Sequence, residues 1–456
     1  MEMVKKKNVD MTEGNPIKII ILFTLPLLLG NVFQQFYNII DSVIVGRFVG
    51  DSALAAVSSS GSLINLLIGL IQGISVGAGI VIAQYYGARN IEKLRKSMHT
   101  ATLFSMILGI FMTIVGIIIT PMLLRLMNTP EEVLPQSIAY FRTYFGGVFF
   151  TILYNMGSSI FRSIGDSKHP LYFLIISCFI NVILDLLFVA VFKWGVIGVG
   201  IATIIAQAVS TVLTYGLLIK TKEEYNFSFK ELKIDFQELK KIIALGIPSG
   251  IQNSIISFAN VFIQSNINAF GPIAQAGCGS YSKIEGFATM PSGSFSMALS
   301  TYVGQNIGAK KYQRAEKGAW LGLIVDVLIT ESIGILLFIF APYLISIFSD
   351  TNNVIEVGVL QARTVSLFYG LLAFAHGMSG IMRGAGFSKT PMFIMIFCWV
   401  IVRVCGIPIA LSWPSCNTIQ TIFWFYPFTW GLSFIVLNLI SFYYSKTAKK
   451  HYRFMN

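Results

Sequence analysis

An aspartate lies inside the first long apolar segment of this sequence. Asp41 belongs to the stretch PLLLGNVFQQFYNIIDSVIVGR. The same stretch also contains Gln34, Tyr37 and Asn38. An acidic side chain facing hydrocarbon is costly, so an aspartate within a membrane normally faces a bundle interior or a water-filled cavity and marks an ion or proton pathway. Asp41 is therefore a candidate for ion binding. In the alternative interpretation, it lies at the outer end of its helix, in the interface beside Arg47.

A second acidic residue lies in a later apolar segment, together with an amide. Asn181 and Asp185 are four residues apart, so they share one face of a helix. At a rise of about 1.5 Å per residue, Asp185 lies about 12 Å and Asp41 about 10 Å below the outer ends of their segments. Thr203, in the next segment, has a similar depth. Three helices are thus expected to bring two carboxylates, an amide and a hydroxyl to a common level.

This set of oxygen atoms suits a small hard cation such as Na⁺, which takes oxygen ligands. It suits a proton equally well, because two nearby carboxylates repel when both are ionised and one of them is then expected to hold a proton. The two ions would compete for the same charge. The alternative is a hydrogen-bond network that only holds the helices together.

The chain that must position these residues has 456 residues, of which 55% are hydrophobic and 12% are charged. This composition excludes a soluble domain and is typical of a polytopic membrane protein. Twelve segments are long enough to cross a hydrocarbon core about 30 Å thick. They span residues 17–47, 52–83, 97–124, 137–161, 170–192, 195–219, 242–268, 273–303, 318–347, 358–382, 391–411 and 419–445. We therefore expect an all-α polytopic membrane protein with twelve transmembrane helices.

The basic residues predict the orientation of these helices. The net charge is +12, yet Lys and Arg gather in every second loop, and the outer loops hold Arg47, Arg125 and Lys193. An excess of positive charge marks cytoplasmic loops, so both termini are expected in the cytoplasm of a bacterial or archaeal cell. The basic residues are distributed over alternate loops rather than gathered in one patch, so we expect no nucleic-acid partner. We expect the protein to lie in the cell membrane, with lipid around it.

Two copies of one six-helix unit make up the sequence. AQYYGARNIEKLRKS follows the second apolar segment and GQNIGAKKYQRAEKG follows the eighth, so that Gln84 aligns with Gln305 at an offset of 221. The same offset aligns RSIGDSKHP with RGAGFSKTP, and an offset of 222 aligns Pro26 with Pro248. Such parallel repeats surround a binding cavity. We predict two six-helix lobes around a central cavity, residues 1–219 and 242–456.

A charged linker, residues 220–241, joins the two predicted lobes on the cytoplasmic side. Its sequence, KTKEEYNFSFKELKIDFQELKK, is compatible with a short amphipathic helix on the membrane surface. Pro26 has a different effect in the first helix, since it removes a backbone donor and favours a bend there.

The repeat also helps to interpret the four polar residues Asp41, Asn181, Asp185 and Thr203. At the corresponding second-half positions the sequence has Ile263, Val402, Gly406 and Trp424. None of these residues can bind a cation. A purely architectural network would more easily have been kept in both halves, so its presence in one half favours a specialised site.

Other residues at membrane depth could line a substrate cavity. Lys283 and Glu285 are about 200° apart on a helix and cannot both face one cavity. Met290 offers an adaptable apolar surface. Arg403 is costly within a membrane unless it is paired, and the sequence does not identify its partner. Because no Ser/His or metal-ligand pairing is legible, we expect neither an enzyme nor a cofactor other than the coupling ion.

In combination, these motifs resemble the multidrug and toxic compound extrusion (MATE) transporters. The resemblance rests on the twofold six-helix repeat, the GARN and GAKK turns, the RSIGDSKHP and RGAGFSKTP pair, and the first-segment P…Q..YN..D pattern. It covers nearly the whole chain. It implies a monomeric secondary transporter that exports small organic, often cationic, drugs by antiport with H⁺ or Na⁺ through alternating access.

Within this family the sequence is most similar to the DinF-like branch, whose amino-terminal lobe carries the coupling carboxylates. The resemblance implies that Asp41, Asn181, Asp185 and Thr203 form the cation network, with Tyr140 as a contributor. It implies a bending role for Pro26 and a cavity-lining role for Gln34 and Tyr37, beside which we place Asn38, Lys283, Glu285 and Met290.

Two alternatives remain at this point. The NorM-like branch uses acidic residues in helices seven and ten, where this sequence has Gln252, Ser254 and His376 instead. Related flippases of lipid-linked saccharides share the repeat architecture and have cavities with more basic residues, and Lys283 and Arg403 keep that function open.

Overall fold

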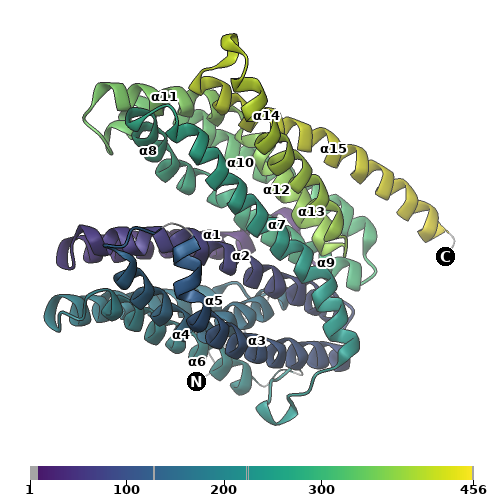
Figure 1. Cartoon of the computed structure of the whole chain (residues 1–456). Coiled ribbons are helices and arrows are strands. Elements are labelled where there is room, and N and C mark those ends of the chain that lie inside the picture. Colours follow the sequence, from purple (N-terminus) through teal and green to yellow (C-terminus); the bar gives the residue numbers. More distant parts are fainter. Residues whose placement is uncertain (1–8, 127–128, 222, 224, 454–456) are drawn as a thin grey trace. The chain divides into compact units, whose positions relative to one another are not determined.

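The computed structural model describes residues 9–126, 129–221, 223 and 225–453, without the side chains of 51–67 and 443–453. Its first half consists of α1 (Pro16–Phe48), α2 (Asp51–Gly87), α3 (Ile91–Leu126), α4 (Leu134–Ser163), α5 (Lys168–Asp185), which continues as the π-helical turn η1 (Leu186–Val191), and α6 (Gly195–Lys220). Figure 1 shows the course of the chain.

The second half begins after a 3₁₀ turn, η2 (Phe229–Glu231), and several of its helices are interrupted. It consists of α7 (Phe236–Asn268), α8 (Pro272–Ala288), α9 (Met290–Gly308), α10 (Tyr312–Ser346), α11 (Asn352–Val365), η3 (Ser366–Phe368), α12 (Tyr369–Gly384), α13 (Lys389–Met395), η4 (Ile396–Ile401), α14 (Val402–Leu411), η5 (Pro414–Cys416) and α15 (Ile419–Arg453). The pairs α8–α9 and α11–α12, and the run α13–η4–α14, each correspond to one predicted transmembrane helix.

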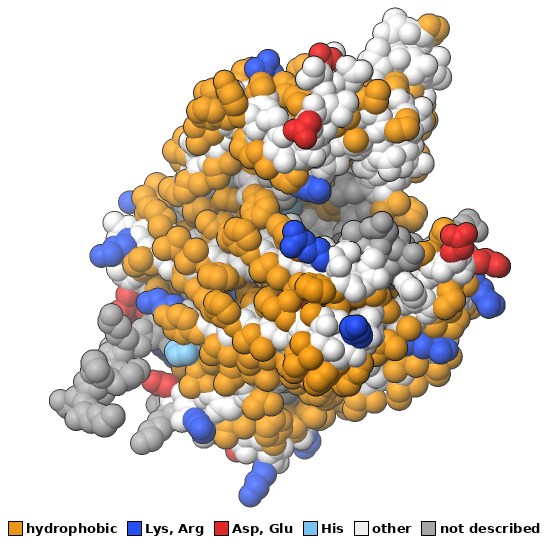
Figure 2. All heavy atoms as spheres, turned by 90° about the vertical axis from the view of Figure 1, so that its left-hand side faces the viewer, with side chains coloured by type: hydrophobic (Ala, Val, Ile, Leu, Met, Phe, Trp, Pro, Cys, Tyr) orange, Lys and Arg blue, Asp and Glu red, His pale blue; other side chains and the backbone are white. Residues whose placement is uncertain are grey.

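The prediction of an all-helical membrane protein is confirmed. Among the described residues, ten helical segments are long and apolar enough to cross a membrane, and α4 and the α8–α9 pair complete the twelve predicted ones. Large apolar side chains such as Ile118, Val212 and Leu439 are more than half exposed. Hydrophobic side chains cover most of the face seen in Figure 2. Such a surface is stable in hydrocarbon rather than in water.

The chain forms two compact units that do not coincide with the two sequence repeats. Unit 1 is Met1–Gly250 with Thr301–Ala315, and unit 2 is Ile251–Ser300 with Glu316–Asn456. Within unit 1, the start of α7 packs on α2 without intervening side chains, since a Cβ on Gly73 would lie 2.9 Å from the Gly246 carbonyl oxygen. The repeat defines the lobes by sequence, whereas packing assigns the first part of α7 and the end of α9 to unit 1.

The repeated glycines of the GARN and GAKK motifs meet inside unit 1. A Cβ on Gly87 would lie 2.8 Å from Gln305 Cα, and one on Gly308 would lie 3.0 Å from Gln84 Cα. Only glycine allows the ends of α2 and α9 to approach so closely. The two copies of the motif therefore cross each other, which explains why both have glycine at this position.

The linker differs from its predicted form. Where residues 225–235 are described, they contain the 3₁₀ turn η2 and no amphipathic helix. Phe227 is buried against unit 1, and Asp235 accepts hydrogen bonds from the backbone N–H groups of Gln237 and Glu238 at the start of α7. The linker does not continue as a helix because the backbone groups of Ser228, Lys233 and Asp235 are hydrogen-bonded to His99 and Thr100 of α3.

Candidate functional site

Two carboxyl groups from distant parts of the sequence meet in unit 1. Asp185 is the last residue of α5 and is fully buried, and Asp41 lies half-buried on α1. Their side chains lie close enough to interact with each other. Two carboxyl groups at such close range repel when both are ionised, so a proton on one of them or a cation between them is favoured. The Oδ1 atom of each aspartate is buried without a hydrogen-bond partner, so the pair has unused oxygen ligands.

An amide and two hydroxyl groups surround this pair. The Asn181 side-chain amide makes two hydrogen bonds when its oxygen and nitrogen are assigned to match their neighbours. Nδ2 then donates to Asp185 Oδ2 at 2.8 Å, and Oδ1 accepts from the Thr203 backbone N–H at 3.2 Å. The Thr203 hydroxyl lies 3.2 Å from the Tyr37 hydroxyl of α1. The structure thus brings together Asp41, Asn181, Asp185 and Thr203, as the sequence analysis expected.

Apolar residues close the site on one side. Tyr140 of α4 is 7% exposed and lies near both carboxyl groups. It belongs to a cluster of buried side chains that also contains Ile44, Val45, Val189, Val196 and Val199. Excluding water from one side of the carboxyl pair strengthens every electrostatic interaction there.

The backbone at Asp185 is irregular. The α-helical hydrogen bonding of α5 ends at this residue, and the next six residues, Leu186–Val191, form a π-helical turn. Single π-turns inside α-helices occur frequently at functional sites. The wider turn places Val189 in the apolar cluster beside Tyr140.

The equivalent region of the second half has no such site. Ile263, the counterpart of Asp41, is 1% exposed and part of the apolar core of unit 2. Gly406, the counterpart of Asp185, packs against an aromatic ring, since a Cβ there would lie 2.6 Å from Phe425 Cε1. These positions serve packing in the second half.

The residues predicted to line a cavity have varied surroundings. On α1, Gln34 and Asn38 are exposed, and Pro26 is buried within a helix that continues on both sides of it. In unit 2, Lys283 is exposed, with Nζ 5.2 Å from the centre of the Phe348 ring, and Met290 is half-buried at the start of α9.

Glu285 and Arg403 belong to a polar network inside unit 2. Glu285 accepts a hydrogen bond from the Tyr281 hydroxyl at 3.3 Å, and that hydroxyl lies 2.9 Å from the hydroxyl of Tyr369. Arg403 is 2% exposed, and its charge interacts with Glu285. Glu285 thus lies within the electrostatic influence of Arg403 without forming a direct ion pair among the described residues.

The immediate contacts of Arg403, which sequence reasoning could not identify, are mostly aromatic. Its Nε donates to Thr429 Oγ1 at 2.8 Å. The guanidinium carbon lies 4.6 Å from the centre of the Tyr426 ring and 5.4 Å from that of Trp399. Cation–π contacts of this kind stabilise a desolvated guanidinium.

The role of Tyr37 beside Thr203 was also missed, because sequence reasoning placed this residue in the substrate cavity. The signal was available, since Tyr37 precedes Asp41 by four residues and therefore shares its helix face.

Over the part of the chain that the structure describes, no three His, Cys, Asp or Glu side chains gather as in a transition-metal site. The ligands offered by the carboxyl pair are oxygens, which suit a proton or Na⁺.

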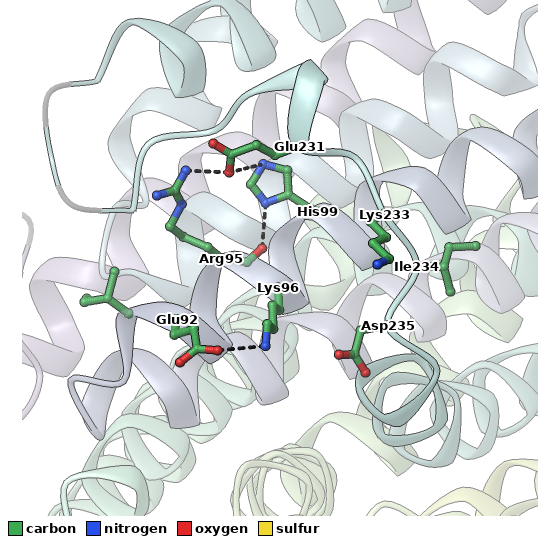
Figure 3. A pocket seen from close by; sticks show the side chains of 9 residues that line it. Glu92, Arg95, Lys96, His99, Glu231, Lys233, Ile234 and Asp235 are labelled. Atoms are coloured by element: carbon green, nitrogen blue, oxygen red, sulfur yellow. Dashed lines mark hydrogen bonds and ion pairs between the residues drawn. The ribbon is translucent and has the colours of Figure 1, made fainter.

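A surface pocket of about 550 Å³ lies elsewhere, between the start of α3 and the linker. Figure 3 shows that its charged side chains are largely engaged with one another. Arg95 pairs with Glu231 at 2.5 Å, and Lys96 pairs with Glu92 at 2.7 Å. The pocket marks the line along which the linker lies against α3.

In the part of the chain that the structure describes, the twelve helical segments with their apolar surface define a polytopic membrane protein. The sequence profile of the MatE family matches residues 26–187 and 248–409, one match in each half of the repeat. The chain belongs to this family, the MATE transporters.

Curated relatives have names that agree with this assignment. The sequence is 33% identical over 383 residues to the probable multidrug resistance protein YoeA of Bacillus subtilis, covering 82% of this chain and 83% of the relative. It is 26% identical over 388 residues to the probable multidrug resistance protein NorM of Thermotoga maritima, covering 83% and 82%.

The fold is also that of a solved transporter. The structure described as the outward-facing conformation of a multidrug resistance MATE family transporter is similar, with a TM-score of 0.91 and 23% sequence identity. The similarity covers 98% of this chain and all of the solved one. The twelve-helix MATE fold extends over practically the whole protein.

Proposed function

We propose that this protein is a secondary active exporter of small organic, often cationic, drugs, driven by antiport with H⁺ or Na⁺. The observation that carries the proposal is the carboxyl pair of Asp41 and Asp185, each with an unpartnered buried oxygen. The multidrug resistance names of the relatives support the substrate class.

The pair couples ion movement to transport because its charge must be neutralised before it can be enclosed. A proton or Na⁺ from outside neutralises it when the site is open to the outside. Conformational change then carries the neutral site to the cytoplasmic side, where the ion leaves. The Asn181 amide keeps Asp185 in place during this cycle, and the Tyr37–Thr203 contact links α1 to α6.

A coupling site in the first half alone supports assignment to the DinF-like branch. In the second half the counterparts of the four ligand residues are Ile263, Val402, Gly406 and Trp424, which cannot bind a cation. We further propose that the protein works as a monomer in the cell membrane of a bacterium or archaeon, with both termini in the cytoplasm.

Drug-resistance assays test export in living cells. Expression in a host that lacks its own efflux pumps is expected to raise the inhibitory concentration of several cationic drugs, because a multidrug exporter lowers their internal concentration. The empty vector is the control. Unchanged resistance to a broad panel, together with rescue of a strain deficient in a lipid-linked saccharide flippase, would favour the flippase function instead.

A further inference from the structure

Two segments that precede the two repeats are bound to the helical hairpins of the opposite repeats. The first strap is residues 9–14, just before α1, and the second strap is residues 227–238, which lead into α7. At the repeat offset of 222, residues 9–14 correspond to 231–236. All the contacts described below lie within unit 1.

The first strap lies on the α9–α10 hairpin of the second half. Met11 is fully buried, and its backbone N–H donates to Gln305 Oε1 at 3.2 Å. Its carbonyl accepts from Asn306 Nδ2 at 3.0 Å. Arg314 donates to the carbonyl oxygens of Glu13 and Gly14, each at 2.7 Å. One arginine thus binds strap carbonyls rather than a carboxylate.

The first strap also contacts the first half. The Val9 N–H donates to the Gly165 carbonyl at 3.2 Å, and Asp10 pairs with Arg89 at the end of α2. Burial acts to raise the pKa of Asp10, but hydrogen bonds from Thr12 and the nearby Arg89 outweigh it and lower that pKa. The strap therefore joins a first-half turn to a second-half hairpin.

The second strap lies on the α2–α3 hairpin of the first half, as Figure 3 shows for residues 231–235. Thr100 Oγ1 donates to the Lys233 carbonyl at 3.3 Å and accepts from the Asp235 N–H at 3.0 Å. Glu238, which is 4% exposed, accepts from Tyr85 and Ser97, each at 3.0 Å. Each repeat is thus held by the hairpin of the other.

We propose that the two straps form a reciprocal latch that keeps the cytoplasmic side closed and must release both hairpins before the transporter opens inward. The inference rests on the proposed function, because only alternating access requires the two halves to part on this side. The hairpins carry the crossing glycines Gly87 and Gly308, so the straps bind beside a close backbone contact between the two sequence repeats within unit 1. Most strap contacts are hydrogen bonds to backbone groups, which water can replace when the straps leave.

Hydrogen–deuterium exchange of the full-length protein in lipid nanodiscs tests the latch. Arg314→Ala removes the arginine contacts of the first strap and is expected to raise amide exchange about tenfold in residues 9–14 and 301–311, the loss of one to two net hydrogen bonds. Because the latch is reciprocal, exchange should also rise in residues 84–90 and 228–238, on the hairpin and strap of the opposite pair.

Lys317→Ala is the matched control, since Lys317 is an exposed cation one turn further along α10. Should Arg314→Ala fail to fold, Lys311→Ala removes a single strap contact, the hydrogen bond to the Thr12 carbonyl at 3.0 Å. Faster exchange confined to residues 9–14, or no change beyond the control, would overturn the latch. Hydrogen–deuterium exchange is measured without any ion gradient, so the test of the latch can be interpreted even if the protein shows no ion-driven export.

Discussion

Replacing Asp185 by asparagine is expected to abolish ion-driven export while leaving the protein folded in the membrane. Asparagine has nearly the same shape and can still accept a hydrogen bond from the Asn181 amide, so the contact at 2.8 Å is kept. It cannot bind a proton or supply a negative charge for Na⁺. Asp41→Asn is expected to have the same effect, because each carboxyl group completes the ion site of the other.

Purified variants in proteoliposomes, loaded with a fluorescent cationic drug, measure this effect. Asp326→Asn is the matched control, since Asp326 is an equally buried carboxyl group in unit 2, hydrogen-bonded to Thr330 and with an unpartnered oxygen. It should keep ion-driven transport. Wild-type transport rates in both Asp41→Asn and Asp185→Asn would exclude the carboxyl pair as the coupling site.

The second large effect concerns stability. Arg403→Met is expected to destabilise the protein by about 3 kcal/mol, because the hydrogen bond to Thr429, the cation–π contacts with two aromatic rings and the interaction with the Glu285 charge are lost together. Methionine fills much of the space between Tyr426 and Trp399, so the main loss is electrostatic. Glu285 would then be buried with only the Tyr281 hydroxyl as a partner.

Thermal unfolding of the detergent-solubilised variants tests this expectation. Arg403→Met combined with Glu285→Gln should recover the part of the lost stability that comes from the interaction of Arg403 with the Glu285 charge. Lys283→Met is the control for loss of a cation from an exposed position of unit 2 and should have little effect. Equal destabilisation by the single and double variants would mean that Arg403 acts through packing alone.

Much of the architecture is predictable from sequence because hydrocarbon imposes simple rules. Only helices satisfy their backbone groups within a lipid bilayer, so long apolar segments become transmembrane helices. The carboxyl pair was also predictable, because Asp41 and Asp185 are too costly in a membrane unless they share a site. The i, i+4 spacing then placed Asn181 beside Asp185.

The remaining features depend on contacts between residues far apart in the sequence. Arg403 and Glu285 are separated by more than a hundred residues, and hydropathy does not say which helices pack together. The linker was expected to form a surface helix because its composition is amphipathic. Its backbone is instead hydrogen-bonded to Thr100 and His99 of α3, and partners so distant in the sequence cannot be predicted from a local sequence pattern.

We propose that the Asp41–Asp185 pair couples export to an inward flow of H⁺ or Na⁺. The most direct test of this coupling is drug efflux from proteoliposomes under an imposed pH gradient, an imposed Na⁺ gradient, or neither, with Asp41→Asn as the control. The pH gradient is expected to drive efflux by the wild type, Na⁺ is expected to compete with protons rather than act at a separate site, and Asp41→Asn is expected to respond to neither ion. Wild-type efflux that is the same under all three conditions would contradict this coupling.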